Sequence, residues 1–226
     1  MRLPGFGGWH EDPLWSYIYP WLVEHPEVGR HVWRIGTGSD LRLVDRAAAE
    51  LGTLPPGARV LDVPSGSGVA LRGLRPGQDV SVVAADISPT MLGRTRATAA
   101  RRGVADQVSP VVADVGELPF ADGAFDLVAS FTGLHCFPDP RAAIEEMVRV
   151  LAPGGVLTGS SIFTDTGARF EPLRRAGARA GILGPMCSSG EAIRWMRAAG
   201  CDTVDLQLHG ALGYFRAVRP GTGGTT

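Results

Sequence analysis

Two glycines separated by one residue follow a short apolar run, and this pattern is typical of a ligand-binding loop. The run Val60–Val63 contains Asp62, and Gly66 and Gly68 come a few residues later. Because glycine has no Cβ, the chain can turn tightly there and pass close to a ligand. The helix expected next would offer free N–H groups and the positive end of its dipole to an anionic group. A tight strand-to-helix turn without a ligand is the structural alternative.

Two further carboxylates follow the next two apolar runs. Asp86 comes after Val80–Ala85, and Asp114 comes shortly after Ser109–Val112. Because consecutive parallel strands end at one crevice, we expect Asp62, Asp86 and Asp114 to face the same cleft. A carboxylate at the end of the second strand is suited to bind both hydroxyls of a ribose. Each Asp taken alone has an alternative as a helix cap or a surface residue.

A nicotinamide dinucleotide is the weaker candidate ligand for this cleft. Its fingerprint is G-x-G-x-x-G, and Leu71 stands here in place of the last glycine. A carboxylate beside the loop, as Asp62 would be, also repels a pyrophosphate. An acidic residue at that place favours a cationic ligand, such as the ammonium and sulfonium of S-adenosylmethionine.

The elements that must position these residues alternate between strands and helices. Five short, mostly β-branched apolar runs predict strands buried on both faces, as in a parallel sheet. They are Arg59–Val63, Val80–Ala85, Ser109–Val112, Phe125–Phe131 and Gly155–Ile162. Thr203–Leu208 and Leu212–Val218 predict a terminal antiparallel hairpin. We therefore predict an α/β fold with a doubly wound, mostly parallel seven-stranded sheet that ends in this hairpin.

Helix boundaries between the strands have clear local signals. Ser88-Pro89 and Asp139-Pro140 each combine an N-cap residue with a proline at the first helical position, and Gly103 is placed to end the first of these helices. Ser188 and Glu191 have the spacing of a capping box.

The composition excludes several kinds of chemistry. All 22 basic residues are Arg, and the 226-residue sequence has no Lys and no Asn. Without Lys there is no pyridoxal Schiff base, no P-loop G-K-[ST] and no Tyr-x-x-x-Lys pair of a short-chain dehydrogenase. The formal net charge of −1 argues against nucleic acid or an anionic membrane as the main partner.

The spacing of the cysteines and histidines argues against disulfide bonds and metal sites. Cys136, Cys187 and Cys201 are far apart and indicate reduced cytoplasmic thiols. No His or Cys cluster has metal-ligand spacing, so we expect no metal. Residues 1–9 lack the pattern of a signal peptide, and no apolar run approaches about 18 residues. We expect a cytoplasmic protein, monomeric or homodimeric, with a small-molecule substrate.

At these motifs the sequence resembles the class I S-adenosylmethionine-dependent methyltransferases, most of all the small-molecule group that includes quinone-biosynthesis enzymes. The likeness covers roughly residues 58–162. It rests on the loop Val60–Gly68, the ribose segment Ala85–Leu92, the segments Ala113–Asp114, Leu118–Phe120 and Phe125–Val128, and the turn Arg149–Gly155. The resemblance implies the Rossmann-like methyltransferase fold and S-adenosyl-L-methionine as the cofactor.

The resemblance implies that Asp62, Pro64, Ser65, Gly66 and Gly68 bind this cofactor. The glycines would approach its methionine part, with Asp62 near the ammonium. Pro64 departs from the family pattern, where the first loop residue is glycine; proline fixes φ at about −65° and removes an N–H donor. If that position needs a positive φ, the loop should be distorted and its affinity for the cofactor reduced. We expect this loss of affinity to be small, because the two later glycines remain.

The adenosine part would be held by the next two strand ends. The resemblance implies that Asp86 binds the ribose hydroxyls and that Ile87 or Met91 packs on the adenine. Asp114 would accept the adenine amino group, and the Val115 N–H would meet a ring nitrogen.

The end of the fourth strand would lie beside the sulfonium. Ser130, Phe131 and Thr132 would border it, as the resemblance implies. His135 follows a few residues later and is the candidate general base, since His titrates near neutrality. A structural His bonded to the backbone is the equal alternative.

Substrate selection is expected outside the shared core. Residues 1–55 contain four of the five Trp and are predicted to be an N-terminal helical cap, with Tyr17, Trp21 and Trp33 facing the substrate. Packing on the sheet or a dimer contact is the alternative. His135, Phe163 and Met186 are the further substrate candidates.

The remaining chain divides into residues 56–220, the cofactor-binding domain, and 221–226, a tail predicted to be disordered. Four arginines between Phe163 and Met186 favour a solvated helix face over an anion site. They are Arg169, Arg174, Arg175 and Arg179. The sequence predicts a methyltransferase of small-molecule and secondary metabolism acting on a lipophilic or aromatic metabolite. The alternative is a protein of the same fold that binds the cofactor without methylating, such as a cyclase.

Overall fold

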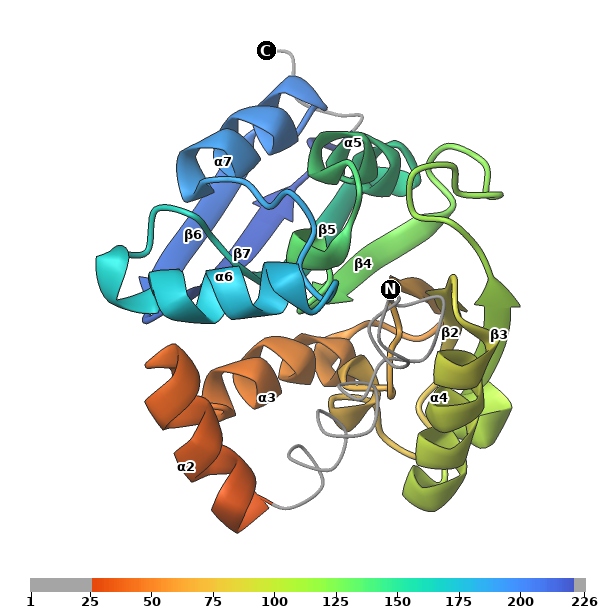
Figure 1. The fold of residues 1–226 in the computed structure, drawn as a ribbon. Coiled ribbons are helices and arrows are strands. Elements are labelled where there is room, and N and C mark those ends of the chain that lie inside the picture. Colours follow the sequence, from red (N-terminus) through yellow and green to blue (C-terminus); the bar gives the residue numbers. More distant parts are fainter. Residues whose placement is uncertain (1–25, 222–226) are drawn as a thin grey trace.

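Seven strands form one sheet within residues 26–221, the part of the chain that this computed structural model describes (Figure 1). The strands are β1 (Ala58–Asp62), β2 (Val80–Asp86), β3 (Val108–Val112), β4 (Phe125–Phe131), β5 (Leu151–Ile162), β6 (Thr203–His209) and β7 (Leu212–Val218). Their order is β3-β2-β1-β4-β5-β7-β6. Strands β1 to β5 are parallel, and β7 runs antiparallel to both β5 and β6. The predicted doubly wound sheet with its terminal hairpin is confirmed.

Helices cover both faces of the sheet. The α-helices are α2 (Pro26–Thr37), α3 (Arg42–Ala48), α4 (Pro89–Arg102), α5 (Pro140–Arg149), α6 (Glu171–Arg179) and α7 (Ser189–Ala198). The 3-10 turns are η2 (Ala49–Thr53), η3 (Ala70–Arg72), η4 (Ala105–Gln107), η5 (Leu134–Cys136) and η6 (Ala168–Phe170). Figure 1 shows α5 and α7 on one side of the sheet and α3 and α4 on the other. In the described part, none of the helices is both long enough and apolar enough to span a bilayer.

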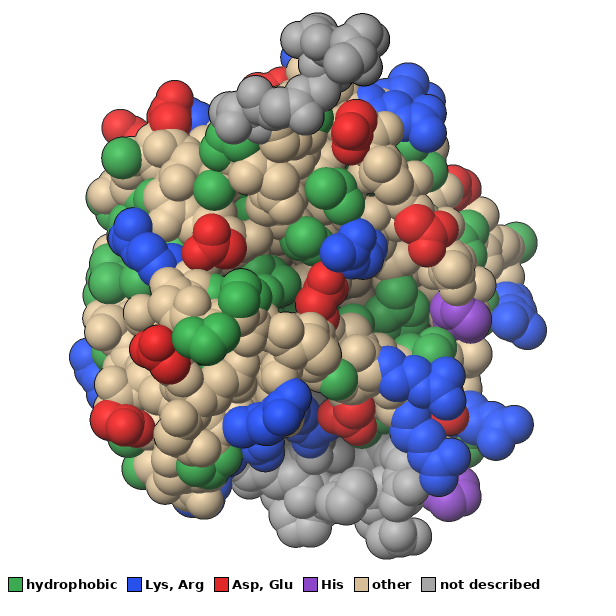
Figure 2. Space-filling model, turned by 180° about the vertical axis from the view of Figure 1, so that it is seen from behind, with side chains coloured by type: hydrophobic (Ala, Val, Ile, Leu, Met, Phe, Trp, Pro, Cys, Tyr) green, Lys and Arg blue, Asp and Glu red, His purple; other side chains and the backbone are tan. Residues whose placement is uncertain are grey.

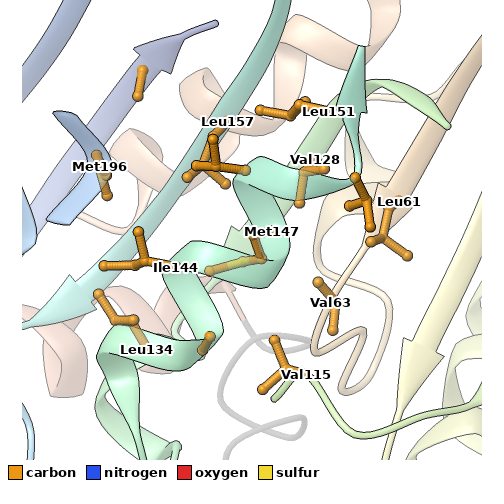
Figure 3. Packing of buried hydrophobic residues seen from close by; sticks show 14 of the residues in the cluster. Leu61, Val63, Val115, Val128, Leu134, Ile144, Met147, Leu151, Leu157 and Met196 are labelled. Atoms are coloured by element: carbon orange, nitrogen blue, oxygen red, sulfur yellow. The ribbon is translucent and has the colours of Figure 1, made fainter. Parts of the chain in front are cut away.

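Two apolar clusters hold these layers together. On the α5 and α7 side, Ile144, Met147 and Met196 pack against β1, β4 and β5 (Figure 3). On the other side, Val44 of α3 and Ala99 of α4 pack against the opposite face of the sheet, in a cluster with residues of β1, β2 and β4. Burial of both faces explains why the strands are continuous apolar runs in the sequence.

Local capping sets the helix starts as predicted. Ser88 accepts the Met91 N–H at 3.4 Å, and Asp139 accepts the Arg141 and Ala142 N–H groups at 3.0 Å. Ser188 forms the predicted capping box. Gly103 ends α4 with φ of +68°, a conformation that costs glycine little.

The helix expected directly after the glycine loop is replaced by the single turn η3, and that prediction is wrong. Gly73 follows this turn and lies directly against the carbonyl of Ala48, where a Cβ would have no room. A residue with a side chain would clash with α3 at position 73. The turn therefore ends at this glycine and does not continue as an α-helix. The loop consequently has no α-helix dipole behind it.

The described part of the amino-terminal segment packs largely on the sheet. Leu41, Val44, Ala48 and Leu51 are all buried in the cluster on the α3 side. These residues therefore pack on the sheet and do not form a cap over the cleft. The predicted substrate residues Tyr17 and Trp21, and the tail 222–226, lie outside the described residues, so the cap remains a prediction there.

Figure 2 shows the molecule from behind, with acidic and basic side chains both present over this face and apolar side chains between them. Blue side chains gather toward the lower right of this view. The face thus carries charges of both signs.

Candidate functional site

The ends of β1, β2 and β4 lie side by side at the carboxyl edge of the sheet. Asp62 pairs in register with Ala84 of β2 and Ala129 of β4. The side chains that follow these positions, Asp86 and Ser130, are therefore brought to the same edge as Asp62. The structure thus assembles the predicted strand-end residues into one site.

The glycine loop turns in the way its two glycines allow. Gly66 and Gly68 have φ of +52° and +83°. The Ser65 N–H donates to the Ala85 carbonyl at 2.8 Å, and the Gly68 N–H donates to the Ser65 carbonyl at 2.7 Å. The first bond ties the loop to the end of β2, and the second closes the turn within the loop.

Pro64 is accommodated by a neighbouring glycine. The Val63–Pro64 peptide is cis. The proline ring packs against Gly133, at the place that a Cβ of that residue would occupy. Gly133 after β4 therefore makes room for the residue that departs from the family pattern.

Asp86 is buried, with 5% of its surface exposed, and it holds the loop with one oxygen. Its Oδ2 accepts the Gly66 N–H at 2.9 Å, and its Oδ1 accepts the Ser88 N–H at 2.9 Å. Burial raises the pKa of this carboxyl, and the backbone donors oppose that shift. Each carboxylate oxygen has a second acceptor site, so hydroxyls of a ribose could also bind; that role stays a prediction.

Asp62 is the most isolated charge of the site. Its side chain is 1% exposed, and among the described residues Oδ2 finds no hydrogen-bond donor. Burial, and then the negative charge of Asp86, raise its pKa well above the usual value. The Ser130 Oγ is likewise buried and unpartnered within the described chain. Buried polar atoms of this kind call for a partner, and a cationic ligand that also carries polar groups would supply one.

The third strand end is more open than the other two. Asp114 lies two residues beyond β3, is exposed, and accepts the Gly116 N–H at 2.8 Å. The Val115 side chain is buried in the core. Of the two residues predicted to pack on an adenine, Ile87 is 36% exposed and Met91 is buried. Ile87 is thus the accessible one, while all four assignments stay predictions.

Two residues other than glycine adopt a positive φ in the described chain, and both are predicted site residues. Thr132 and Met186 each have φ of +54°. Thr132 follows Phe131, which is buried, and its N–H donates to the Ser160 carbonyl at 2.8 Å. A β-branched residue is rarely found in this conformation, and such strain is typical of functional sites.

His135 is buried, and its ring is oriented by the backbone. Its Nδ1 accepts the Ile162 N–H at 3.1 Å and lies 3.3 Å from the Ser161 Oγ. Accepting a backbone N–H places the proton of the neutral ring on Nε2. Desolvation by burial lowers the pKa of His135 to about 4. While this bond exists, Nδ1 cannot take up a proton; the catalytic role of His135 therefore stays a prediction.

The predicted substrate residue Met186 lies in a loop beside His135. The Gly184 N–H donates to the His135 carbonyl at 2.8 Å, which places the loop containing the half-buried Met186 next to η5. Phe163 is fully buried in the core, so its predicted substrate contact is corrected to a packing role. Trp33 of α2 is half-buried and packs on the α3-side cluster.

The predicted solvated arginine face is wrong at one position. Arg174 is only 6% exposed. It donates to Glu171 at 3.1 Å, to the Thr166 Oγ1 at 3.1 Å and to the Gly167 carbonyl at 3.2 Å. The reason is that α6 folds back on the turn after β5, so Arg174 satisfies that turn. Arg169, Arg175 and Arg179 are exposed, as expected.

Several residues around the site have no distinctive pattern in the sequence. Ile162 fixes His135 through a backbone amide, which no side-chain pattern reveals. Thr95 and Thr98 of α4 donate to loop carbonyls, and they resemble ordinary helix threonines in the sequence. Within residues 26–221, no three His, Cys, Asp or Glu side chains are grouped as ligands of a metal.

Comparison with known proteins identifies the relatives of this chain. Residues 60–155 match a family described as "Methyltransferase domain". Demethylmenaquinone methyltransferase of Thermus thermophilus is 42% identical over 123 residues, which are 53% of this chain and 54% of that protein. The 27-O-demethylrifamycin SV methyltransferase of Amycolatopsis mediterranei is 38% identical over 116 residues, 51% of this chain and 42% of that protein. The chain thus matches about half or less of the length of these relatives.

A solved structure extends the likeness of the fold over nearly the whole chain. The [4+2]-cyclase SpnF superposes with a TM-score of 0.68 over 92% of this chain and 95% of the cyclase, at 21% identity. At that identity the likeness concerns the fold alone.

Proposed function

We propose that this chain is a class I S-adenosylmethionine-dependent methyltransferase that transfers the methyl group of S-adenosylmethionine to a small, lipophilic or aromatic metabolite. The match of residues 60–155 to a methyltransferase domain family and the likeness to a demethylmenaquinone methyltransferase support this. The observation that carries the proposal is the buried Asp62 carboxylate, whose Oδ2 lacks a donor among the described residues beside the glycine loop. A cofactor with an ammonium and a sulfonium is the kind of ligand that this charge would attract.

When bound, the cofactor supplies an activated methyl group, so the protein mainly has to align it with the acceptor. In our proposal, Asp62 and the Ser130 Oγ hold the amino-acid part of the cofactor. Asp86 holds the ribose while keeping Gly66 in place. Thr132 lies at the end of β4, and its strained backbone fixes the wall beside the methyl group.

Two lines support a lipophilic or aromatic acceptor. The names of two relatives concern a menaquinone precursor and a rifamycin, which are bulky and largely apolar compounds. The residues next to the proposed cleft include the exposed Ile87 and the half-buried Met186. The relatives' names cover more than one acceptor, so the proposal does not fix whether O, N or C is methylated.

His135 either takes part in the reaction or has a structural role only. With Nδ1 occupied by Ile162, neutral His135 would donate from Nε2 to an acceptor oxygen rather than remove its proton. His135→Asn keeps an acceptor close to the position of Nδ1 and removes Nε2. A fall in kcat with an altered pH profile would support a catalytic part, and unchanged turnover would leave His135 structural.

The function is tested by incubating the protein with S-adenosylmethionine and a panel of quinols, phenols and macrocyclic alcohols. Mass spectrometry should find a product heavier by one methyl group, with S-adenosylhomocysteine formed in equal amount. The Asp205→Asn variant, changed on the exposed outer strand β6, is the matched control and should keep the activity. The Asp62→Asn variant should lose most of it.

A non-methylating reaction is the second candidate, favoured by the fold likeness to a cyclase. It predicts that a substrate is consumed without S-adenosylhomocysteine being formed. Such an outcome, with the cofactor still bound, would reject methyl transfer and retain the cofactor site.

A further inference from the structure

Carbonyl groups of the glycine loop need donors that a following helix would normally supply. In an α-helix each carbonyl accepts an N–H four residues later, but here only the turn η3 follows the loop. The Leu71 carbonyl accepts the Leu74 N–H at 3.2 Å. The carbonyls of Gly66, Ser67 and Arg72 depend on other partners, because unpaired backbone groups are costly when buried.

Helix α4 supplies these donors from three positions along one side. Thr95 Oγ1 donates to the Gly66 carbonyl at 2.9 Å, and Thr98 Oγ1 donates to the Ser67 carbonyl at 2.8 Å. Arg102 donates to the Leu71 carbonyl at 2.9 Å and to the Arg72 carbonyl at 2.8 Å. Residues three and four apart lie on one face of a helix, so these side chains form a single stripe.

The stripe reaches the proposed cofactor contacts directly. Both backbone polar groups of Gly66 are held, its N–H by Asp86 and its carbonyl by Thr95. Thr95 is fully buried, and since its own hydrogen goes to Gly66, the Ser65 hydroxyl donates to Thr95 Oγ1 at 3.2 Å. A Cβ at Gly68 would lie 3.3 Å from the Cβ of Thr98, so this glycine fits against the stripe.

We propose that Thr95 and Thr98 are positioning residues for cofactor binding. Their hydroxyls replace the N–H donors of a following helix and so hold the glycine loop in its binding conformation. They act through the loop backbone and need no contact with the cofactor. The inference rests on the cofactor site and not on the acceptor class proposed above, so it is tested by cofactor binding alone.

The test measures binding of S-adenosylhomocysteine by calorimetry to the full chain and its variants. Thr95→Val and Thr98→Val remove one hydroxyl each at nearly constant volume, and each should raise Kd about three- to tenfold. Thr95→Ser and Thr98→Ser restore the hydroxyl and should bring Kd back to within about twofold of wild type. Hydrogen exchange of residues 65–72 should be faster in the Val variants only.

A control separates positioning from general loss of stability. Ile144→Val lowers stability in the core cluster on the other face of the sheet. It should lower Tm while leaving Kd unchanged. Wild-type Kd in both Thr→Val variants, or an equal increase in Ile144→Val, would overturn the inference. A wild-type chain that binds no S-adenosylhomocysteine would instead overturn the cofactor site itself.

Discussion

Asp62 combines a cost to stability with a gain in binding. Because burial and the charge of Asp86 raise its pKa, the folded state favours the protonated form. For such a carboxyl, stability is lost as pH rises from the ordinary value of 3.8 through the raised one. We predict that Asp62→Asn increases the Tm of the cofactor-free protein at pH 7, measured by thermal unfolding. The exposed Asp205→Asn should leave Tm unchanged.

The same substitution should act in the opposite direction on binding. Removing the negative charge beside a cationic ligand should weaken S-adenosylmethionine binding by about 1.5–3 kcal/mol, the value of a hydrogen bond to a charged group. Titration calorimetry at pH 7 measures this. A variant that is less stable and binds normally would mean that Asp62 has a purely structural partner.

His135 makes a separate prediction for acid stability. Its pKa is about 4 in the folded protein and 6.5 in the unfolded chain, so the unfolded chain takes up the proton first. Stability is therefore unaffected above pH 6.5 and is lost progressively as pH falls to about 4, by roughly 3 kcal/mol. Urea unfolding at several pH values should find this loss in wild type and a much smaller one in His135→Asn. His209→Asn, changed at the end of β6, should keep the wild-type loss.

At the scale of elements, α5 holds the segment that leads from β3 to β4. Arg149 donates to the Leu118 carbonyl at 3.0 Å and the Phe120 carbonyl at 2.9 Å, and it pairs with Glu146 and Asp122 at 2.7 Å. These contacts raise the pKa of Arg149 and lower that of Glu146. The guanidinium fork reaches carbonyls and carboxylates together, which Lys could not imitate.

We predict that Arg149→Ala lowers the free energy of unfolding by about 1–3 kcal/mol, because it leaves partly buried carbonyls without donors. Arg149→Lys should recover only part of this. Arg141→Ala is the control, since it removes an exposed pair with Glu145 worth about 0.3–0.5 kcal/mol. Equal losses in Arg149→Ala and Arg141→Ala, measured by urea unfolding, would contradict this account of α5.

Elements governed by local chemistry could be predicted from the sequence, and those governed by distant contacts could not. The caps at Ser88 and Asp139 lie within a few residues of what they cap, and the strands are legible as apolar runs. The absent helix after Gly68 depends on how Gly73 meets Ala48, which no short window contains. Phe163 and Arg174 were misplaced for the same reason, because their burial arises from packing between segments far apart in the sequence.

At the scale of the whole molecule, the segment after α2 meets the turn between β6 and β7 beside the sheet's carboxyl edge. The turn between β6 and β7 lies at this edge, since Leu212 pairs with Ile162 at the end of β5. The Ala211 N–H donates to the Thr37 carbonyl at 2.7 Å, and the Ser39 and Tyr214 hydroxyls are 3.1 Å apart. The carboxyl-terminal hairpin therefore anchors the segment that leaves α2.

Gly210 provides the tightest point of this contact and the last prediction. Its φ is +68°, and an added Cβ would lie 2.5 Å from the carbonyl carbon and 2.7 Å from the carbonyl oxygen of Gly38. Gly77 has φ of +73° with nothing near its Cβ position, so Gly77→Ala measures the backbone cost alone, about 1–2 kcal/mol. Gly210→Ala should cost about 1–3 kcal/mol more, because backbone must move to admit the methyl group.

The extra cost should also appear in a local measurement. If the hairpin anchors residues 37–39, Gly210→Ala should loosen α2, and trypsin should cleave at the exposed Arg34 faster than in wild type. Gly77→Ala lies far from this contact and should leave that cleavage unchanged. Of the two glycines, only Gly210 combines the left-handed backbone with a close neighbouring segment. Equal unfolding free energies for the two variants, or equal cleavage at Arg34, would therefore mean that α2 is held by contacts other than the hairpin.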